Sequence, residues 1–143
     1  MLYNSSVSGN SAGFSSGGAA NSVFHNCIVY YNTAPSDANY DTLASVFTNS
    51  CAMPLPSLGI NNFTNAPGLA GFRNPHIVFA SVCRDSGSNA LVNSQTDIDN
   101  ESRLNGQVDI GCDEFWPAGI TGGLAVIMWT PTNIVMMGAP LEF

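Results

Sequence analysis

Residues 3–10 read YNSSVSGN, residues 25–32 read HNCIVYYN, and residues 48–53 read TNSCAM. Each stretch places an asparagine before small side chains and then apolar ones. Apolar and polar residues alternate over short distances in and around these stretches, which is typical of half-buried β-strands. The three stretches are therefore interpreted as copies of one structural unit, and their spacing along the chain predicts how the units are arranged.

The asparagines of the three copies recur at a nearly constant interval. Asn4, Asn26 and Asn49 are 22 and 23 positions apart, and Asn10 and Asn32 repeat the 22-residue interval. One coil of a right-handed parallel β-helix needs roughly 20-odd residues, and each coil of such a solenoid contacts only its neighbours. Asparagine accepts the left-handed backbone of a tight corner, and its amide can bond to the same residue in the next coil. We therefore predict three to four stacked coils with structural corners at Asn4, Asn26 and Asn49.

The remainder of the chain is also typical of an all-β protein. Helical periodicity is almost absent, and turn clusters such as NSAGFSSGGAAN separate short strand-like segments. A length of 143 residues suits about one domain. We assign residues 1–115 to the β-helix with its terminal element and residues 116–143 to a C-terminal strand extension. No segment reaches the roughly 18–20 continuous apolar residues of a membrane span.

The charge balance excludes several classes of function. The chain has no lysine, three arginines and ten carboxylates, which gives a formal net charge of −7. Nucleic-acid binding needs several cations to neutralise phosphates, so a nucleic-acid partner is not expected. A P-loop and a Schiff-base lysine are excluded because both require a lysine. Four cysteines in an Asn/Ser-rich chain without lysine favour an extracellular location, with a signal peptide expected upstream of Met1.

Six segments carry a resemblance to a known family. They are NCIVYYN (26–32), NSCAMPLP (49–56), APGL (66–69), SVCRDSG (81–87), TDIDN (96–100, followed by Arg103) and VDIGCDE (108–114). In this order the chain resembles the C-terminal part of secreted bacterial right-handed parallel β-helix proteins with choice-of-anchor or polymorphic-outer-membrane-type repeats. The last segment resembles the end of such a β-helix, and residues 116–143 are similar to a linker plus the first strands of a PKD-type, immunoglobulin-like module.

The resemblance implies a non-catalytic protein that is secreted or held at the cell surface. Adhesion or carbohydrate binding through one face of the solenoid is the leading expectation, with a polysaccharide or a host or cell-surface glycan as the partner. The alternative is a polysaccharide-degrading glycoside hydrolase of the β-helix class. Because exposed coil ends and unpaired apolar strands invite association, we expect a homo-oligomer, with a dimer formed through the coil ends or the C-terminal strands.

An acidic cluster near the end of the predicted solenoid is open to three interpretations. Its members are Asp85, Asp97, Asp99, Asp109, Asp113 and Glu114. The favoured one is structural: carboxylates accept backbone N–H bonds at turns, Asp109 among them, and Arg103 neutralises part of the charge. Asp97 and Asp99 are candidate calcium ligands, although no EF-hand spacing is present and no cofactor is required. If the protein is a hydrolase, Asp97, Asp109 and Asp113 are the candidate catalytic acids and bases.

The cysteines leave the disulfide pattern open. Cys27 and Cys51 are 24 positions apart, about one coil, but the asparagine register aligns Cys27 with Ser50, and a one-residue offset turns the two side chains to opposite faces. A bulge would be needed for this pair to form. Cys83 with Cys112 is a second candidate pair. Four buried free thiols are the alternative to both.

Aromatic side chains on the repeats are candidates for sugar stacking. Tyr30, Tyr31 and Tyr40 fall on or next to the repeating strands, and Tyr30 and Tyr31 cannot both face the core because neighbouring strand residues point to opposite sides. The alternative interpretation is that these rings fill the core. His25 and His76 stand alone in strand-like contexts without a spaced partner, so we interpret both as ordinary structural or surface residues.

Overall fold

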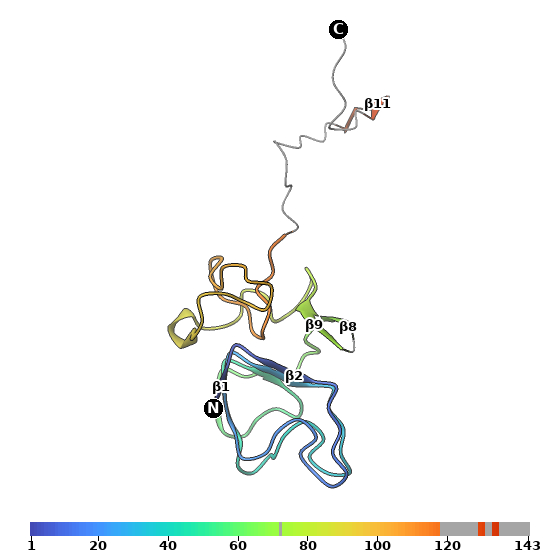
Figure 1. Ribbon diagram of the computed structural model, residues 1–143, viewed down its shortest axis with the longest axis vertical. Helices are drawn as coiled ribbons and strands as arrows, with labels where there is room; N and C mark the ends of the chain where they lie inside the picture. The colour runs from blue at the N-terminus through green and yellow to red at the C-terminus, as the bar shows by residue number, and fades with distance from the viewer. Residues whose placement is uncertain (72, 118–128, 131–132, 135–143) are drawn as a thin grey trace.

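The structure of the protein is a computed structural model that describes residues 1–71, 73–117, 129–130 and 133–134 (Figure 1). The expected all-β class is confirmed, because the helical content of the described residues is a single short 3-10 turn. The elements are β1 (Leu2–Tyr3), β2 (Ser6–Ser8), β3 (Val23–His25), β4 (Ile28–Tyr30), β5 (Val46–Thr48), β6 (Cys51–Ala52), β7 (Gly59–Ile60), β8 (Leu69–Gly71), β9 (Asn74–Ile77), the 3-10 turn η1 (Asn89–Leu91), β10 (Trp129–Thr130) and β11 (Asn133–Ile134).

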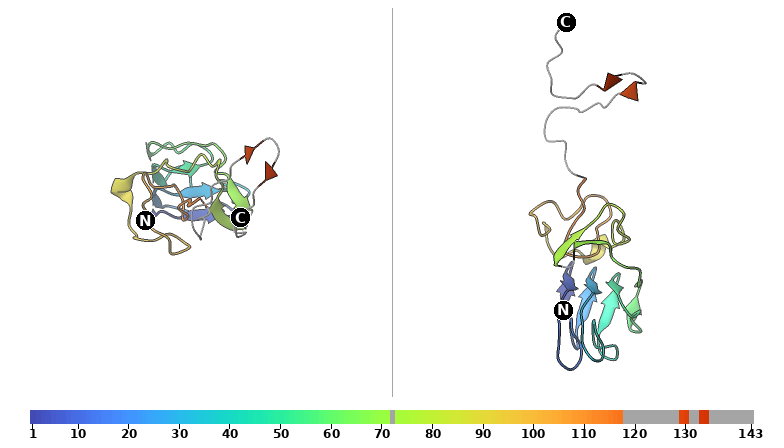
Figure 2. Two further views of the ribbon diagram at one scale, coloured as in Figure 1. Left: turned by 90° about the horizontal axis from the view of Figure 1, so that it is seen from above. Right: turned by 90° about the vertical axis from the view of Figure 1, so that its right-hand side faces the viewer.

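The repeating stretches form two small parallel sheets. One sheet has the order β1-β3-β5-β7 and the other the order β2-β4-β6, so each sheet takes alternate strands of the chain. In the first sheet Leu2 lies beside Phe24 and Phe24 beside Phe47, which are steps of 22 and 23 residues. In the second sheet Val7 lies beside Val29. Successive lengths of chain therefore stack in parallel at the interval found in the sequence, and Figure 2 shows the stacked layers side by side.

A left-handed asparagine joins the two sheets in every layer. Asn4, Asn26 and Asn49 follow β1, β3 and β5 with φ angles of 41°, 52° and 50°. Asparagine is enriched at such angles because its short polar side chain tolerates the left-handed region better than most residues do. Asn61 takes the same role after β7 with a φ of 57°. The sequence repeat did not reveal Asn61, because the layer that leads to it contains only 12 residues from corner to corner.

The expected amide bonding between layers occurs at Asn10 and Asn32 but not at the Asn4 and Asn26 corner. The Asn10 amide and backbone nitrogen both donate to Oδ1 of Asn32, each at 3.0 Å. The expectation is wrong for the Asn4 and Asn26 corner: both amide atoms of Asn4 are buried and have no partner among the described residues, and the Asn26 amide bonds to the backbone of Ser88. At Asn26 the partner of the amide is therefore a segment 62 residues away and not the neighbouring layer.

The interior of the stack is an aromatic and aliphatic core. Phe24 and Phe47 are fully buried and stacked, with ring centroids 4.4 Å apart, and Tyr40 packs against Phe47. Val29 and Cys27 complete the layer from the second sheet. Full burial of each large apolar side chain stabilises the fold by about 1.5–3 kcal/mol, so these stacked rings are a main source of cohesion between layers.

A second core lies between the stack and residues 74–117, which we call the terminal segment. Ile28 and Cys51, on the outer side of β4 and β6, pack with Ile77, Cys83 and Ile110. Figures 1 and 2 both show the terminal segment beside the corner between the two sheets. We expected this segment to finish the solenoid after its last coil, and instead it covers the flank of the stack.

Hydrogen bonds attach the terminal segment to the first two layers. The backbone nitrogen of Gly111 donates to the Asn26 carbonyl at 2.9 Å, and the nitrogen of Cys112 donates to Ser6 Oγ at 3.1 Å. Gly111 has a φ of 115°, and a Cβ at this position would lie 2.7 Å from the Ile28 side chain. A glycine is therefore needed both for its backbone conformation and for this close approach.

Little of the C-terminal extension is described. β10 and β11 form an antiparallel pair, with Trp129 beside Ile134. The predicted linker and the rest of the immunoglobulin-like module within 116–143 lie outside the described residues, apart from residues 116–117 and this pair. Among the described residues no helix has the length and apolar character needed to cross a membrane.

Candidate functional site in the terminal segment

An acidic cavity of about 220 Å³ opens on the surface of the terminal segment. It collects residues from three separate pieces of chain: β9, the loop around residue 100, and the VDIGCDEF stretch with the tryptophan that follows. The polar and aromatic side chains that line it are His76, Asp99, Glu101, Asp113, Glu114, Phe115 and Trp116. The sequence therefore assembles a site here from segments that carry no common motif.

Asp97 shapes the loop that carries two of the lining carboxylates. Its Oδ1 accepts the backbone N–H groups of Asp99, at 2.9 Å, and Glu101, at 3.0 Å. Its Oδ2 accepts the N–H of Glu114 at 3.1 Å. An aspartate that binds amides two and four residues ahead replaces the bonds a regular element would supply. Asp97 thus fixes Asp99 and Glu101 at the cavity, and its own oxygens are engaged by backbone groups.

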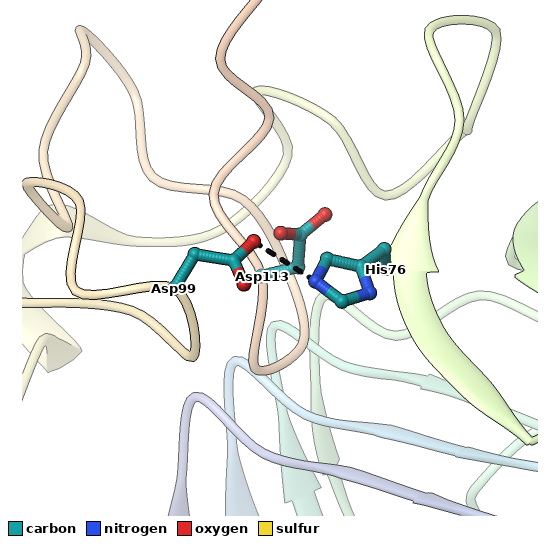
Figure 3. Close-up of side chains that lie close together, drawn as sticks. All are labelled: His76, Asp99 and Asp113. Carbon is teal, nitrogen blue, oxygen red and sulfur yellow. Dashed lines mark hydrogen bonds and ion pairs between the residues drawn. The ribbon is translucent and has the colours of Figure 1, made fainter.

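His76 and Asp99, which both line the cavity, lie next to each other (Figure 3). Nε2 of His76 lies 2.9 Å from Oδ2 of Asp99, and Nδ1 contacts the side-chain oxygen of Asn74. Asp113 lies close by, with its Oδ2 accepting the backbone N–H of Ile77 at 2.8 Å. The bond to Asp99 is the main reason that the pKa of His76 is raised, and burial of the ring opposes this effect.

Two neighbouring carboxylates are almost fully buried: Asp109, and Glu114 in the lining of the cavity. Asp109 is 1% exposed and accepts the N–H groups of Asp85 and Phe115. Glu114 is 2% exposed and accepts the N–H of Asp109 with Oε2 at 2.9 Å. Burial is the largest effect on both: it raises the pKa of Asp109, and it raises the pKa of Glu114 to about 7. Glu114 is therefore a carboxyl group that gains or loses its proton near neutral pH.

Arg103 does not form the ion pairs that we expected. Its guanidinium is 1% exposed and donates to the carbonyls of Gly111 and Asn4, while Nε and Nη1 have no partner within the part of the chain that the structure describes. No described carboxylate lies within ion-pair distance of it. Burial lowers the pKa of Arg103, and the negative charges of Glu114 and Asp97 counteract this effect. Through these two hydrogen bonds Arg103 connects the terminal segment to the first layer.

The three carboxylates considered as hydrolase residues have different environments. Asp113 lines the cavity. Asp97 lies behind it, with both oxygens bound to backbone nitrogens. Asp109 is buried, and its carboxylate accepts the N–H groups of Asp85, 24 residues earlier, and of Phe115, so its geometry is that of a structural residue. The two candidate calcium ligands, Asp97 and Asp99, form a close group of three with Glu101.

The tyrosine candidates do not form one exposed row. Tyr40 is 1% exposed and its hydroxyl donates to the Pro54 carbonyl, so it is a core residue and cannot contact a glycan in this structure. Tyr30 is half-buried, and its hydroxyl donates to the carbonyl of Thr64 at 3.0 Å. Tyr31 is 40% exposed and packs edge-on against Tyr30. Only Tyr31 presents a sizeable ring surface to solvent.

All four cysteines are free thiols, so neither candidate disulfide is present. Cys27 belongs to the inner core and Cys51 to the second core, because the register pairs Cys51 with Ile28 and turns Cys27 to the other face. Cys83 is fully buried in the second core, whereas Cys112 is partly exposed and bonds to Ser6 and Pro75. Burial raises the pKa of Cys27 to about 11.

In the reduced, folded chain we expect Cys112 alone to react quickly with Ellman's reagent. The other three thiols have 0% exposure, so the reagent reaches them only after unfolding. Thiol titration checks this result: one fast equivalent in buffer and four in guanidinium chloride. The variant Cys112→Ser should show no fast equivalent. A fast thiol that persists in this variant would contradict the buried positions of the others.

Among the cavity residues, sequence reasoning missed His76, Glu101 and Trp116, together with the apolar Ile77 and Phe115. His76 was interpreted as a lone structural histidine, because its partners are 23 and 37 positions away. Glu101 and Trp116 were not singled out either. Only the close sequence spacing of Asp97, Asp99 and Glu101 was available as a local signal, since long-range packing brings the other residues together.

No family model, no curated protein and no solved structure matches this chain.

Proposed function

We propose that the chain is part of a right-handed parallel β-helix that serves as a non-catalytic extracellular or cell-surface scaffold and binds a glycan at the acidic cavity. The observation that carries this proposal is the cavity itself, in which an exposed tryptophan stands beside carboxylates that can accept hydrogen bonds. Sugar rings are recognised by this combination of a flat apolar surface and oriented polar groups.

The layered sheets support the β-helix part of the proposal. Each strand connects to a parallel strand of the same sheet through a crossover, and such connections are right-handed in about 98% of cases. The aligned left-handed asparagines support it further, since a solenoid needs the same corner in every coil. The edges of β1 and β7 have no further strand partner among the described residues, and pairing of two copies there would give the homo-oligomer that we propose.

The cavity chemistry supports a glycan as its ligand. Trp116 is 37% exposed, and its Nε1 donates to the Ser102 carbonyl at 3.1 Å, which holds the ring in place. Asp99 and Glu101 offer acceptors for sugar hydroxyls nearby. A net charge of −7 disfavours anionic polysaccharides, so a neutral glycan is the proposed class.

The extracellular location rests on composition and on the resemblance to secreted bacterial β-helix proteins. Free thiols remove disulfides as an argument for export. Surface polarity supplied by Asn, Ser and Thr without lysine remains the physical support for this part of the proposal.

Substituting Trp116 by alanine is expected to weaken glycan binding at least about tenfold. The ring supplies the apolar surface for stacking, and losing that contact costs roughly 1.5 kcal/mol or more. Native electrophoresis through gels that contain a neutral polysaccharide (an arabinoxylan, a galactomannan or a mixed-linkage glucan) measures the affinity as retarded migration.

Tyr31→Ala is the matched control, because Tyr31 is an exposed aromatic residue outside the cavity. In the polysaccharide gels, the Tyr31→Ala variant should migrate as the unmodified chain does. If Tyr31→Ala abolishes retardation while Trp116→Ala does not, the glycan lies on the tyrosine face. If no gel retards the unmodified chain, the glycan proposal fails.

One observation favours the hydrolase alternative. Glu114 lines the cavity with a pKa raised to about 7, which is the property of a general acid in glycoside hydrolysis. A hydrolase would release reducing sugar from the retarding polysaccharide, and Glu114→Gln would abolish that release while leaving retardation intact. Absence of reducing sugar together with retardation supports the binding role.

A further inference from the structure

We propose that His76, Asp99 and Asp113 form a binding site for one zinc ion at the cavity. This site goes beyond glycan binding and does not depend on it. The three residues come from β9, from the loop around residue 100 and from the VDIGCDEF stretch, so one ion would connect three pieces of the terminal segment (Figure 3).

The ligand atoms are close to the spacing that zinc requires. One nitrogen of His76 and one oxygen from each aspartate all lie within 4.8 Å of one another. Tetrahedral zinc with bonds of about 2.0 Å separates neighbouring ligand atoms by about 3.3 Å. Small side-chain rotations therefore bring the three atoms onto one ion, and a fourth position is left for water, as in zinc sites with three protein ligands.

The hydrogen bonds around His76 prepare Nε2 as a ligand. Oδ1 of Asn74 accepts the backbone N–H of His76 at 3.2 Å, which fixes that amide atom as the oxygen. The same oxygen contacts Nδ1 of the ring, so Nδ1 must carry a hydrogen. In the metal-free chain a proton lies between Nε2 and Oδ2 of Asp99, and zinc would take the place of this proton when it binds Nε2. A bond from Nδ1–H to an oxygen acceptor is the usual outer-shell arrangement of metal-bound histidines.

Asp113 supplies a carboxylate of which only one oxygen is engaged in a hydrogen bond. It is 5% exposed, and Oδ2 accepts the Ile77 N–H. The described residues donate no hydrogen bond to Oδ1. Oδ1 is not among the buried atoms that lack a partner, and Asp113 lines the cavity, so this oxygen is accessible to a cation there.

The charges around the site favour a divalent cation. Glu101 and Glu114 line the same cavity, and no arginine lines it. An imidazole nitrogen with two carboxylates selects zinc over calcium, because calcium prefers a shell of six to eight oxygens. The all-oxygen group of Asp97, Asp99 and Glu101 is the competing site, and a variant can separate the two.

Isothermal titration of the metal-free full chain with zinc chloride tests the proposal. We expect one ion per chain. His76→Gln and Asp99→Asn should each weaken the affinity at least about tenfold, since each removes one of three protein ligands. Both residues are exposed enough for the variants to fold. A tetrahedral cobalt spectrum that disappears in His76→Gln would identify the nitrogen ligand.

Glu101→Gln is the matched control, because it removes the same charge from the same cavity and leaves the three ligands intact. Its zinc affinity should change by less than about threefold. Loss of binding in Glu101→Gln with retention in His76→Gln would overturn the proposal, and so would the absence of zinc binding by the unmodified chain. The titration contains no glycan, and Trp116→Ala should bind zinc normally, so failure of this proposal and failure of glycan binding are distinguishable.

Discussion

Replacing Asn26 by alanine is expected to lower the free energy of unfolding by about 3–5 kcal/mol. Asn26 is fully buried, its Oδ1 accepts the Ser88 N–H at 2.8 Å, and its Nδ2 donates to the Ser88 carbonyl at 2.9 Å. Alanine would leave both backbone groups of Ser88 without these partners, at about 1–3 kcal/mol each. It would also adopt a φ of 52°, which costs a residue with a Cβ about 1–2 kcal/mol. Urea unfolding followed by tryptophan fluorescence measures the change.

Asn61→Ala separates the two causes. Asn61 has a φ of 57°, but its side chain is exposed and forms no hydrogen bond with the described residues. Its loss of stability should therefore be limited to the backbone cost, about 1 kcal/mol. Asn26→Gly provides the complementary case, since glycine keeps the backbone and loses only the bonds to Ser88. Equal losses in Asn26→Ala and Asn61→Ala would contradict a structural bridge to the terminal segment.

The stacked layers were predictable because the physical cause lies in local sequence. A corner that demands left-handed backbone selects asparagine, and the repetition of Asn4, Asn26 and Asn49 gives the length of the layer. The flank position of the terminal segment was not predictable in the same way. Asn26 meets Ser88 across 62 residues, and Arg103 meets Asn4 across 99. Neither contact follows from periodicity, because both depend on how the second core closes.

The residues of the candidate site were also predictable only in part. Asp99 and Asp113 were expected in an acidic cluster because they are close in sequence to other carboxylates. His76 joins them only because the N–H of Ile77 binds Asp113 and so brings β9 to the VDIGCDEF stretch. Arg103 lies close enough to the acidic cluster for the charges of Glu114 and Asp97 to counteract the effect of burial on its pKa, but the direct ion pairs that we expected are missing among the described residues for a related reason. Its planar guanidinium finds carbonyls at the junction with the first layer, and the carboxylates beside it are already bound by backbone N–H groups.

We expect the protein, with EDTA present to exclude metal ions, to be more stable at about pH 5 than at about pH 8. Burial raises the pKa of Glu114 from 4.5 to about 7, and it also raises the pKa values of Asp109 and Asp113. A carboxyl group whose pKa is higher in the folded state than in the unfolded chain favours folding while it is protonated. Its contribution is complete below about pH 4.5 and is lost as the pH rises through about 7. His76, whose pKa is raised by Asp99, contributes in the same direction.

Glu114→Gln tests this assignment, because glutamine keeps an oxygen for the Asp109 N–H and cannot ionise. The variant should match the unmodified chain at about pH 5 and exceed its stability at about pH 8, by about 1–3 kcal/mol, since one pKa unit corresponds to about 1.4 kcal/mol. Urea unfolding at a series of pH values measures both effects. The variant Glu101→Gln serves as control, because Glu101 is exposed and its substitution should leave the pH dependence unchanged. A Glu114→Gln chain that is less stable than the unmodified one at about pH 8 would mean that the ionised carboxylate stabilises the terminal segment, and burial would then not be the dominant effect on this group.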